Sequence, residues 1–267
     1  MVHVQTRRIE RFADIVGCAC GGSLAPASSR EVVCDRCEKP YHTYDGILLA
    51  GHDDPAEDEA KRREEEIRDR QAPLYDVLFG ASVPGLMETR WAHSQIARRS
   101  PRTALDVGCG TGRMTLELAR HSNRVVSVDR SIVSLQRCRE KLRQRGLEHK
   151  VLLVKSDINS IPLRPASVDL TVTTQVIQHL PTEEDRSECV RDIARATKHD
   201  GTLVMTVYAW DEAQNYNREK EGEHKGGIRY FRFTHDELRS LLSPHFRVES
   251  VRSCLGKLLF TVGARSG

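Results

Sequence analysis

Glycine stands at every second position in Gly108, Gly110 and Gly112, shortly after Asp106 and between a strand-like and a helix-like run. Because glycine has no Cβ, the backbone here can approach a ligand closely and adopt positive φ. The N-terminus of the following helix would direct free N–H groups and a positive dipole toward a carboxylate or a phosphate. The spacing therefore predicts a pocket for a nucleotide-type ligand.

Two acidic residues follow the next two predicted strands. Asp129 comes about twenty residues after the glycines, where a carboxylate can accept both hydroxyls of a ribose. Asp157, followed by Ile158, comes after the next strand and could accept a hydrogen bond from an adenine amino group. A dinucleotide site is the alternative, but its usual spacing is G-x-G-x-x-G, and the spacing here suits an amino-acid ammonium beside Asp106 better than a pyrophosphate.

Four of the eight cysteines, Cys18, Cys20, Cys34 and Cys37, form two close pairs near the N-terminus. Two such pairs suit a tetrahedral zinc ion with four thiolate ligands, which leaves no open position for chemistry. Disulfides are the alternative and are rare in a reducing compartment. The first pair has one intervening residue instead of two, and His42 lies close enough to replace a cysteine, so the ligand set stays open.

Strands and helices alternate from residue 100 onward, which predicts a doubly wound, mostly parallel α/β sheet. Thr234 and Glu237 have the spacing of a capping box. The expected strands are 102–107, 124–128, 150–154, 168–173, 202–208, 246–253 and 258–263, and the expected helices are 113–121, 186–197 and 234–242.

The net charge of the 267-residue chain is +3, which is too small to indicate nucleic-acid binding. Composition divides the chain into three zones. Residues 1–52 form the cysteine module, 53–70 an exposed, charged connecting helix, and 71–267 the catalytic domain. No run approaches the roughly 18 apolar residues of a membrane span. With no apolar signal core either, we expect a cytoplasmic protein.

The glycine loop and the two acids resemble class I S-adenosylmethionine (SAM) dependent methyltransferases of the type 11 kind, over residues 90–263. The resemblance implies a seven-stranded Rossmann-like sheet whose last two strands form an antiparallel edge. It also implies SAM as cofactor. The methionine end of SAM would lie on Asp106, Gly108, Gly110 and Gly112. The ribose would be held by Asp129 with Arg130, and the adenine by Asp157 with Ile158. Gln175 and Val176 would lie between the cofactor and the acceptor.

The cysteine module resembles the zinc-ribbon activator subunit of tRNA, rRNA and protein methyltransferases, down to its ending Asp45-Gly46-Ile47. It resembles more loosely the zinc domain of bacterial 23S rRNA guanine methyltransferases. The resemblance implies a structural zinc ion, and the shortened first pair departs from it.

Residues after the fourth and fifth catalytic strands should face the methyl acceptor, at the edge where ligands bind in this architecture. His179 could be a general base, or a histidine that begins a helix and bonds backbone. Tyr208 could stack on a planar acceptor or pack in the core. The polar segment 211–227 is expected to be a lid that carries Tyr230 toward the site. The further candidates for facing the acceptor are Gln175, Gln178, Trp210 and Asp211.

Three functions remain open from the sequence. The first is methyl transfer to nitrogen or oxygen of a small molecule, as in a biosynthetic pathway. The second is methylation of a tRNA or rRNA base or side chain, because segments 176–180, 208–210 and 228–234 resemble the wobble-uridine carboxymethyl methyltransferases of tRNA. The third is a non-catalytic SAM-binding scaffold. A basic stripe would favour RNA, and a closed apolar pocket a small molecule.

Overall fold

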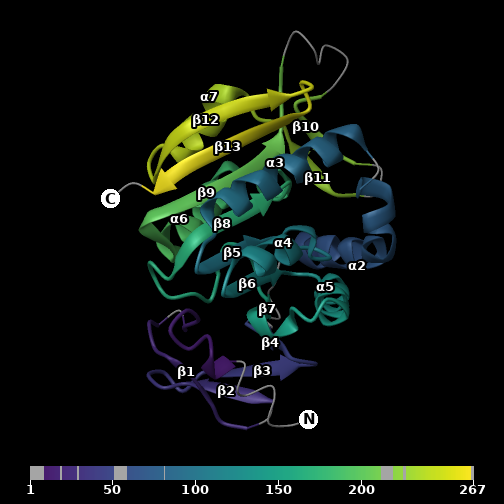
Figure 1. The fold of residues 1–267 in the computed structure, drawn as a ribbon. Coiled ribbons are helices and arrows are strands. Elements are labelled where there is room, and N and C mark those ends of the chain that lie inside the picture. The colour runs from purple at the N-terminus through teal and green to yellow at the C-terminus, as the bar shows by residue number, and fades with distance from the viewer. Residues whose placement is uncertain are drawn as a thin grey trace.

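The computed structural model describes residues 9–18, 20–28, 30–50, 59–80, 82–211, 219–224 and 227–265, and eleven of its strands form one continuous sheet (Figure 1). Seven strands make the catalytic part, in the order β7-β6-β5-β8-β9-β13-β12. Only β13 runs antiparallel to its neighbours β9 and β12. The predicted doubly wound fold and its antiparallel edge are confirmed. The seven strands are β5 Thr103–Val107, β6 Arg124–Asp129, β7 Val151–Lys155, β8 Val168–Thr174, β9 Thr197–Tyr208, β12 Phe246–Cys254 and β13 Leu258–Arg265.

The central strands are apolar on both faces because helices cover both faces of the sheet. All five residues of β5 are buried. One face packs against α3 Val83–Arg99, α4 Arg113–His121 and α5 Ile132–Gln144. The other packs against α6 Glu183–Ala196 and α7 His235–Leu242. The expected capping box is present, since Thr234 and Glu237 exchange side-chain to backbone hydrogen bonds of 2.9 and 3.1 Å at the start of α7.

Four short strands near the N-terminus extend the same sheet instead of standing apart. They are β1 Leu24–Pro26, β2 Glu31–Cys34, β3 Pro40–Tyr44 and β4 Ile47–Leu49. Positive φ at Asp45 and Gly46 closes the β3–β4 hairpin, as a two-residue turn matched to strand twist requires. β4 then pairs in parallel with β7, with Ile47 opposite Leu153. The cysteine module is therefore joined to the catalytic sheet by a strand ladder.

The charged helix is longer than expected and is not a plain connector. It forms α2, Glu59–Gly80, and lies beside α5 at the edge of the catalytic part (Figure 1). Its charged residues satisfy the three- and four-residue spacing of a solvated helix, yet Ile67 and Ala72 are buried. One side of α2 therefore packs against the molecule.

The described part of the segment expected to form a lid contributes one strand to a small hairpin. β10 Glu221–Glu223 pairs with β11 Arg229–Phe231. Residues 212–218 and 225–226 lie outside the described residues, so the lid stays a prediction. Within the described chain, no helix has both the length and the apolar character that a bilayer crossing needs.

Candidate functional site

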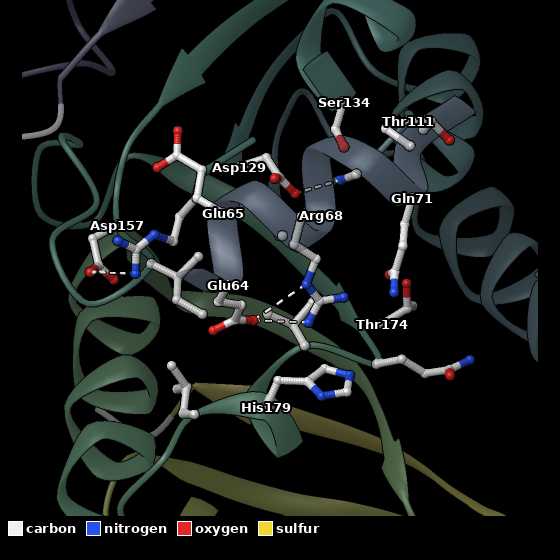
Figure 2. Close-up of a pocket in the computed structure, with 18 residues that line it drawn as sticks. Glu64, Glu65, Arg68, Gln71, Thr111, Asp129, Ser134, Asp157, Thr174 and His179 are labelled. Atoms are coloured by element: carbon white, nitrogen blue, oxygen red, sulfur yellow. Dashed lines mark hydrogen bonds and ion pairs between the residues drawn. The ribbon is translucent and has the colours of Figure 1, made fainter. Parts of the chain in front are cut away.

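A cavity lies at the carboxyl ends of β5, β6, β7 and β8, and α2 forms one of its walls (Figure 2). Parallel strands bring residues far apart in the chain to this edge, as the architecture predicts. Nine of the residues singled out in the sequence line it: Gly108, Gly110, Asp129, Arg130, Asp157, Ile158, Gln175, Val176 and His179. The structure therefore brings most of the expected cofactor residues together.

The glycine loop is fastened to Asp129. The backbone N–H of Gly110 donates to Asp129 Oδ2 at 2.8 Å, and that of Ser131 donates to Oδ1 at 2.9 Å. Burial raises the pKa of Asp129, and these two amide hydrogen bonds oppose that shift. A Cβ on Gly110 would meet nothing within 4 Å, whereas one on Gly108 would come within 2.4 Å of Val176. Gly110 is thus the glycine that leaves room in the cavity.

Asp106 and Gly112 lie outside the cavity lining as the described residues define it. Asp106 is 1% exposed, and Thr115 Oγ1 donates to its Oδ2 at 2.6 Å. A Cβ on Gly112 would come within 2.4 Å of Cys138 Sγ, so Gly112 lets α4 pack against α5. Asp106 therefore contacts α4, and Gly112 packs against α5.

Replacing Asp106 by asparagine is expected to stabilise the protein increasingly as pH rises. Burial raises the pKa of Asp106 from 3.8 to about 7, so the folded state holds its proton more tightly than the unfolded chain does. The tighter proton binding by folded Asp106 stabilises the wild-type protein fully below about pH 4, and this stabilisation is lost as pH rises through about 7. The gain from Asp106→Asn should approach roughly 4 kcal/mol at pH 8.5 at most. Thermal unfolding at pH 5 and 8.5 checks this, and a pH-independent difference in melting temperature would contradict it.

Acidic and basic side chains from α2 and the strand ends pair around the cavity. Arg130 and Asp157 form an ion pair of 3.4 Å, and Glu65 of α2 pairs with Lys155 at 2.9 Å. Glu64 and Arg68 pair within α2 at 3.0 Å and project into the space between Asp129 and His179 (Figure 2).

The sequence analysis did not predict that this helix forms a wall of the cavity. The spacing of Glu64, Arg68, Gln71 and Ala72 could have indicated it, because these residues recur on one side of α2.

A second cavity adjoins the first beside α3 and the ends of β8 and β9. Among the described residues, Gln175 alone lines both cavities. The second cavity is lined by Ser82, Pro84, Gly85, Glu88, Arg113, Gln175, Tyr208, His224, Arg232, Lys257 and Leu258. Of these, Gln175 and Tyr208 were expected individually from the sequence, and His224 and Arg232 lie on segments that the sequence had singled out, 211–227 and 228–234.

Two histidines and two tyrosines gather near this junction. The His179 ring meets that of Tyr208 edge-on at 5.6 Å, and the His224 ring lies 5.9 Å from Tyr208 and 4.6 Å from Tyr230. His179 Nδ1 lies 2.7 Å from the carbonyl oxygen of Arg229, so Nδ1 carries the proton and donates. Burial lowers the pKa of His179 well below its usual value. His179 is therefore neutral, with the lone pair on Nε2.

Four further expected residues lie outside both cavity linings as the described residues define them. Tyr230 reaches the cluster only through His224. Gln178 is fully buried. The backbone N–H of Trp210 donates to Phe233 O at 2.7 Å. Asp211 follows Trp210 at the start of the polar segment.

The four N-terminal cysteines come together with all sulfur atoms within 4.8 Å of one another. The Sγ atoms of Cys18 and Cys37 are 3.6 Å apart, and those of Cys20 and Cys34 are 3.4 Å apart. Tetrahedral zinc with bonds of about 2.3 Å would separate thiolates by roughly 3.8 Å, so the group fits that ion. All four thiols are free, and the group excludes His42.

Comparison with known proteins agrees with this geometry. The family model described as "Methyltransferase domain" matches residues 105–205. An uncharacterised methyltransferase from Geobacillus sp. strain WCH70 is 27% identical over 135 residues, which cover 51% of this chain and 61% of that protein. A carboxy-S-adenosyl-L-methionine synthase from Erwinia tasmaniensis is 26% identical, over 72% of this chain and 76% of the relative.

Solved structures share the fold. The 1,6-didemethyltoxoflavin-N1-methyltransferase of Burkholderia thailandensis, with bound 1,6-didemethyltoxoflavin and S-adenosylhomocysteine, superposes with a TM-score of 0.63. It is 17% identical and covers 86% of this chain and 97% of its own. The matched domain, the shared fold and a cavity at the expected edge of the sheet together support a SAM-dependent methyltransferase.

Proposed function

We propose that this enzyme methylates nitrogen or oxygen of a small molecule, with SAM in the first cavity and the acceptor in the second. The observation that carries the proposal is the junction of the two cavities at Gln175. Transfer needs the acceptor atom next to the methyl group and in line with it, and two cavities that share a lining residue are adjacent, as this requires. When bound, SAM supplies a methyl group whose bond to sulfur breaks, with the electron pair going to sulfur, as the acceptor lone pair forms the new bond.

The residues of the first cavity would hold SAM by its three parts. Asp129 would accept the ribose hydroxyls, with Arg130 beside it. Asp157 and Ile158 would hold the adenine. The methionine end would lie on Gly108 and Gly110 and reach Gln175 and Val176, with Asp106 held against α4 and Gly112 against α5. These assignments rest on the lining and on the hydrogen bonds that already fasten the loop to Asp129.

The residues at the junction would bind the acceptor and remove its proton. Tyr208 and His224 present aromatic faces from the second cavity, and Tyr230 supports His224. His179 Nε2, which carries a lone pair, would accept the proton of a hydroxyl acceptor. A neutral amine needs no base during the transfer itself.

We also propose that Cys18, Cys20, Cys34 and Cys37 hold a structural zinc ion. The sulfur distances support this, and four thiolates leave no open coordination position. Reduced thiols are consistent with a reducing compartment such as the cytoplasm.

RNA is the second candidate acceptor, and the cysteine module favours it through its resemblance to activators of tRNA and rRNA methyltransferases. The net charge of +3 gives little support to a strong phosphate contact. RNA binding that weakens steeply with salt would favour this alternative.

The function is tested by incubating enzyme and SAM with a small-molecule extract and, separately, with total RNA, and by measuring methylated products by mass spectrometry. We expect a methylated product in the small-molecule arm. The variant His179→Gln should lose roughly 100-fold or more in turnover for a hydroxyl acceptor while it still binds S-adenosylhomocysteine. The exposed His199→Gln is the control and should behave as wild type. Methylated nucleosides alone, with no small-molecule product, would overturn the proposal.

A further inference from the structure

A fully buried carboxylate lines the second cavity and contacts Gln175, which lines both cavities. Glu88, on α3, is 0% exposed and lines the second cavity. It accepts hydrogen bonds from Arg113 Nη2 at 2.8 Å and from Gln175 Nε2 at 2.6 Å, and Thr206 Oγ1 donates to its other oxygen. A buried carboxylate is costly unless donors and an opposite charge surround it. Here three elements, α4, the turn after β8, and β9, supply those donors.

The Glu88 contact decides which way the amide of Gln175 points. An ionised carboxylate only accepts hydrogen bonds, so the NH₂ group of Gln175 must face Glu88. Its Oε1 atom then faces away from Glu88. The backbone of Gln175 is fixed as well, because its N–H donates to Thr206 O at 2.9 Å and its φ of 56° lies in the left-handed region. Both ends of this side chain are therefore held at the junction of the two cavities.

We propose that Glu88 is a positioning residue that aims Gln175 Oε1 at the methyl acceptor, and that the acceptor atom carries a hydrogen. This rests on the proposed function. A carbonyl oxygen at the junction can accept a hydrogen bond from an amine or a ring N–H, and so orient the acceptor nitrogen. A carboxylate acceptor has no hydrogen to donate. In the same place, a carboxylate would face the carbonyl oxygen of Gln175 and lie near the negative charge of Glu88, and both would repel it.

The second cavity also carries two cations, Arg232 and Lys257, which would favour an anionic group elsewhere on the acceptor. Arg232 stacks on Tyr230 at 4.2 Å, and Lys257 is exposed on the turn between β12 and β13. Neither contacts Glu88 or Gln175 through a described hydrogen bond or ion pair. The acceptor can therefore carry an acidic group at a position other than the methylated atom.

The orientation is tested by NMR on ¹⁵N-labelled enzyme with S-adenosylhomocysteine. The Gln175 side-chain NH₂ signals are identified by their absence in Gln175→Met. In wild type one of the two protons should be shifted downfield and exchange slowly, because it faces a carboxylate. In Glu88→Gln this separation should collapse, and in Glu249→Gln, an exposed control on β12, it should persist. Unchanged Gln175 signals in Glu88→Gln would overturn the positioning role.

The consequence for catalysis is tested with the acceptor that the product screen returns. Glu88→Gln should lower kcat/KM by roughly tenfold or more, the effect of losing one oriented hydrogen bond, with unchanged affinity for S-adenosylhomocysteine. Gln175→Met should show the same loss if Glu88→Gln does not fold. A product methylated on a carboxylate would overturn the acceptor class. A screen without any small-molecule product would count against the proposed function alone, since the NMR result still decides whether Glu88 orients Gln175.

Discussion

Replacing Cys34 by serine is expected to release zinc and to unfold the N-terminal module. The four sulfur atoms lie within 4.8 Å of one another, and of the four residues only Cys34 belongs to a strand, β2. A structural zinc ion supplies roughly 10 kcal/mol or more of folding free energy in zinc-finger peptides. Because β4 pairs with β7, the loss should also lower the melting temperature of the catalytic domain. Metal analysis of the purified variant and its thermal unfolding measure both effects.

His42→Ala is the matched control for the zinc prediction. His42 was the alternative ligand in the sequence, and it lies on β3 outside the cysteine group. His42→Ala should keep about one zinc ion per chain, whereas Cys20→Ser should lose it. The opposite pattern would replace the four-cysteine set by three cysteines and a histidine.

Replacing Asp129 by alanine is expected to weaken SAM binding by about 1–3 kcal/mol, or roughly five- to 150-fold. The ribose hydroxyls would lose their hydrogen bonds to the Asp129 carboxylate. The amides of Gly110 and Ser131 would also lose their acceptor, which should place the effect near the upper end of that range. Calorimetric titration with SAM measures the change directly.

Two further variants separate the ribose contact from general damage. Asp129→Asn keeps an acceptor oxygen and should have an intermediate affinity. Asp200→Ala, at an exposed position of β9, should bind SAM as wild type does. Equal affinities for Asp129→Ala and wild type would show that another group holds the ribose.

The sequence predicted the fold class and most of the first cavity because both depend on local patterns. Glycines, strand-ending acids and apolar runs can be read within a few residues, and parallel topology then brings the strand ends together. Asp129, Asp157 and Gln175 therefore line one cavity as expected. α7 and its capping box were predictable for the same reason, because Thr234 and Glu237 are three residues apart.

Local patterns were less informative about which residues of a motif reach the cavity and which are buried away from it. Asp106 and Gly112 belong to the same motif as Gly110, yet Asp106 is buried against Thr115 of α4 and Gly112 lies against Cys138 of α5. The motif gives the path of the backbone, and the neighbouring helices decide which of its side chains reach the ligand. The charged helix α2 shows the same limit, because its spacing predicted a solvated surface but not that one side would form a wall of the cavity.

By itself, then, the sequence determined the seven strands of the catalytic part, its helices α4, α6 and α7, the doubly wound class and nine of the residues that line the first cavity. Only the tertiary structure decided that the cysteine module continues the catalytic sheet and that a second cavity meets the first at Gln175. It also decided that Glu88 contacts Gln175 across 87 positions of the chain. Hydrophobic periodicity and turn residues encode what near neighbours do. Contacts between distant segments depend on how the helices pack against the sheet, and no local pattern carries that information.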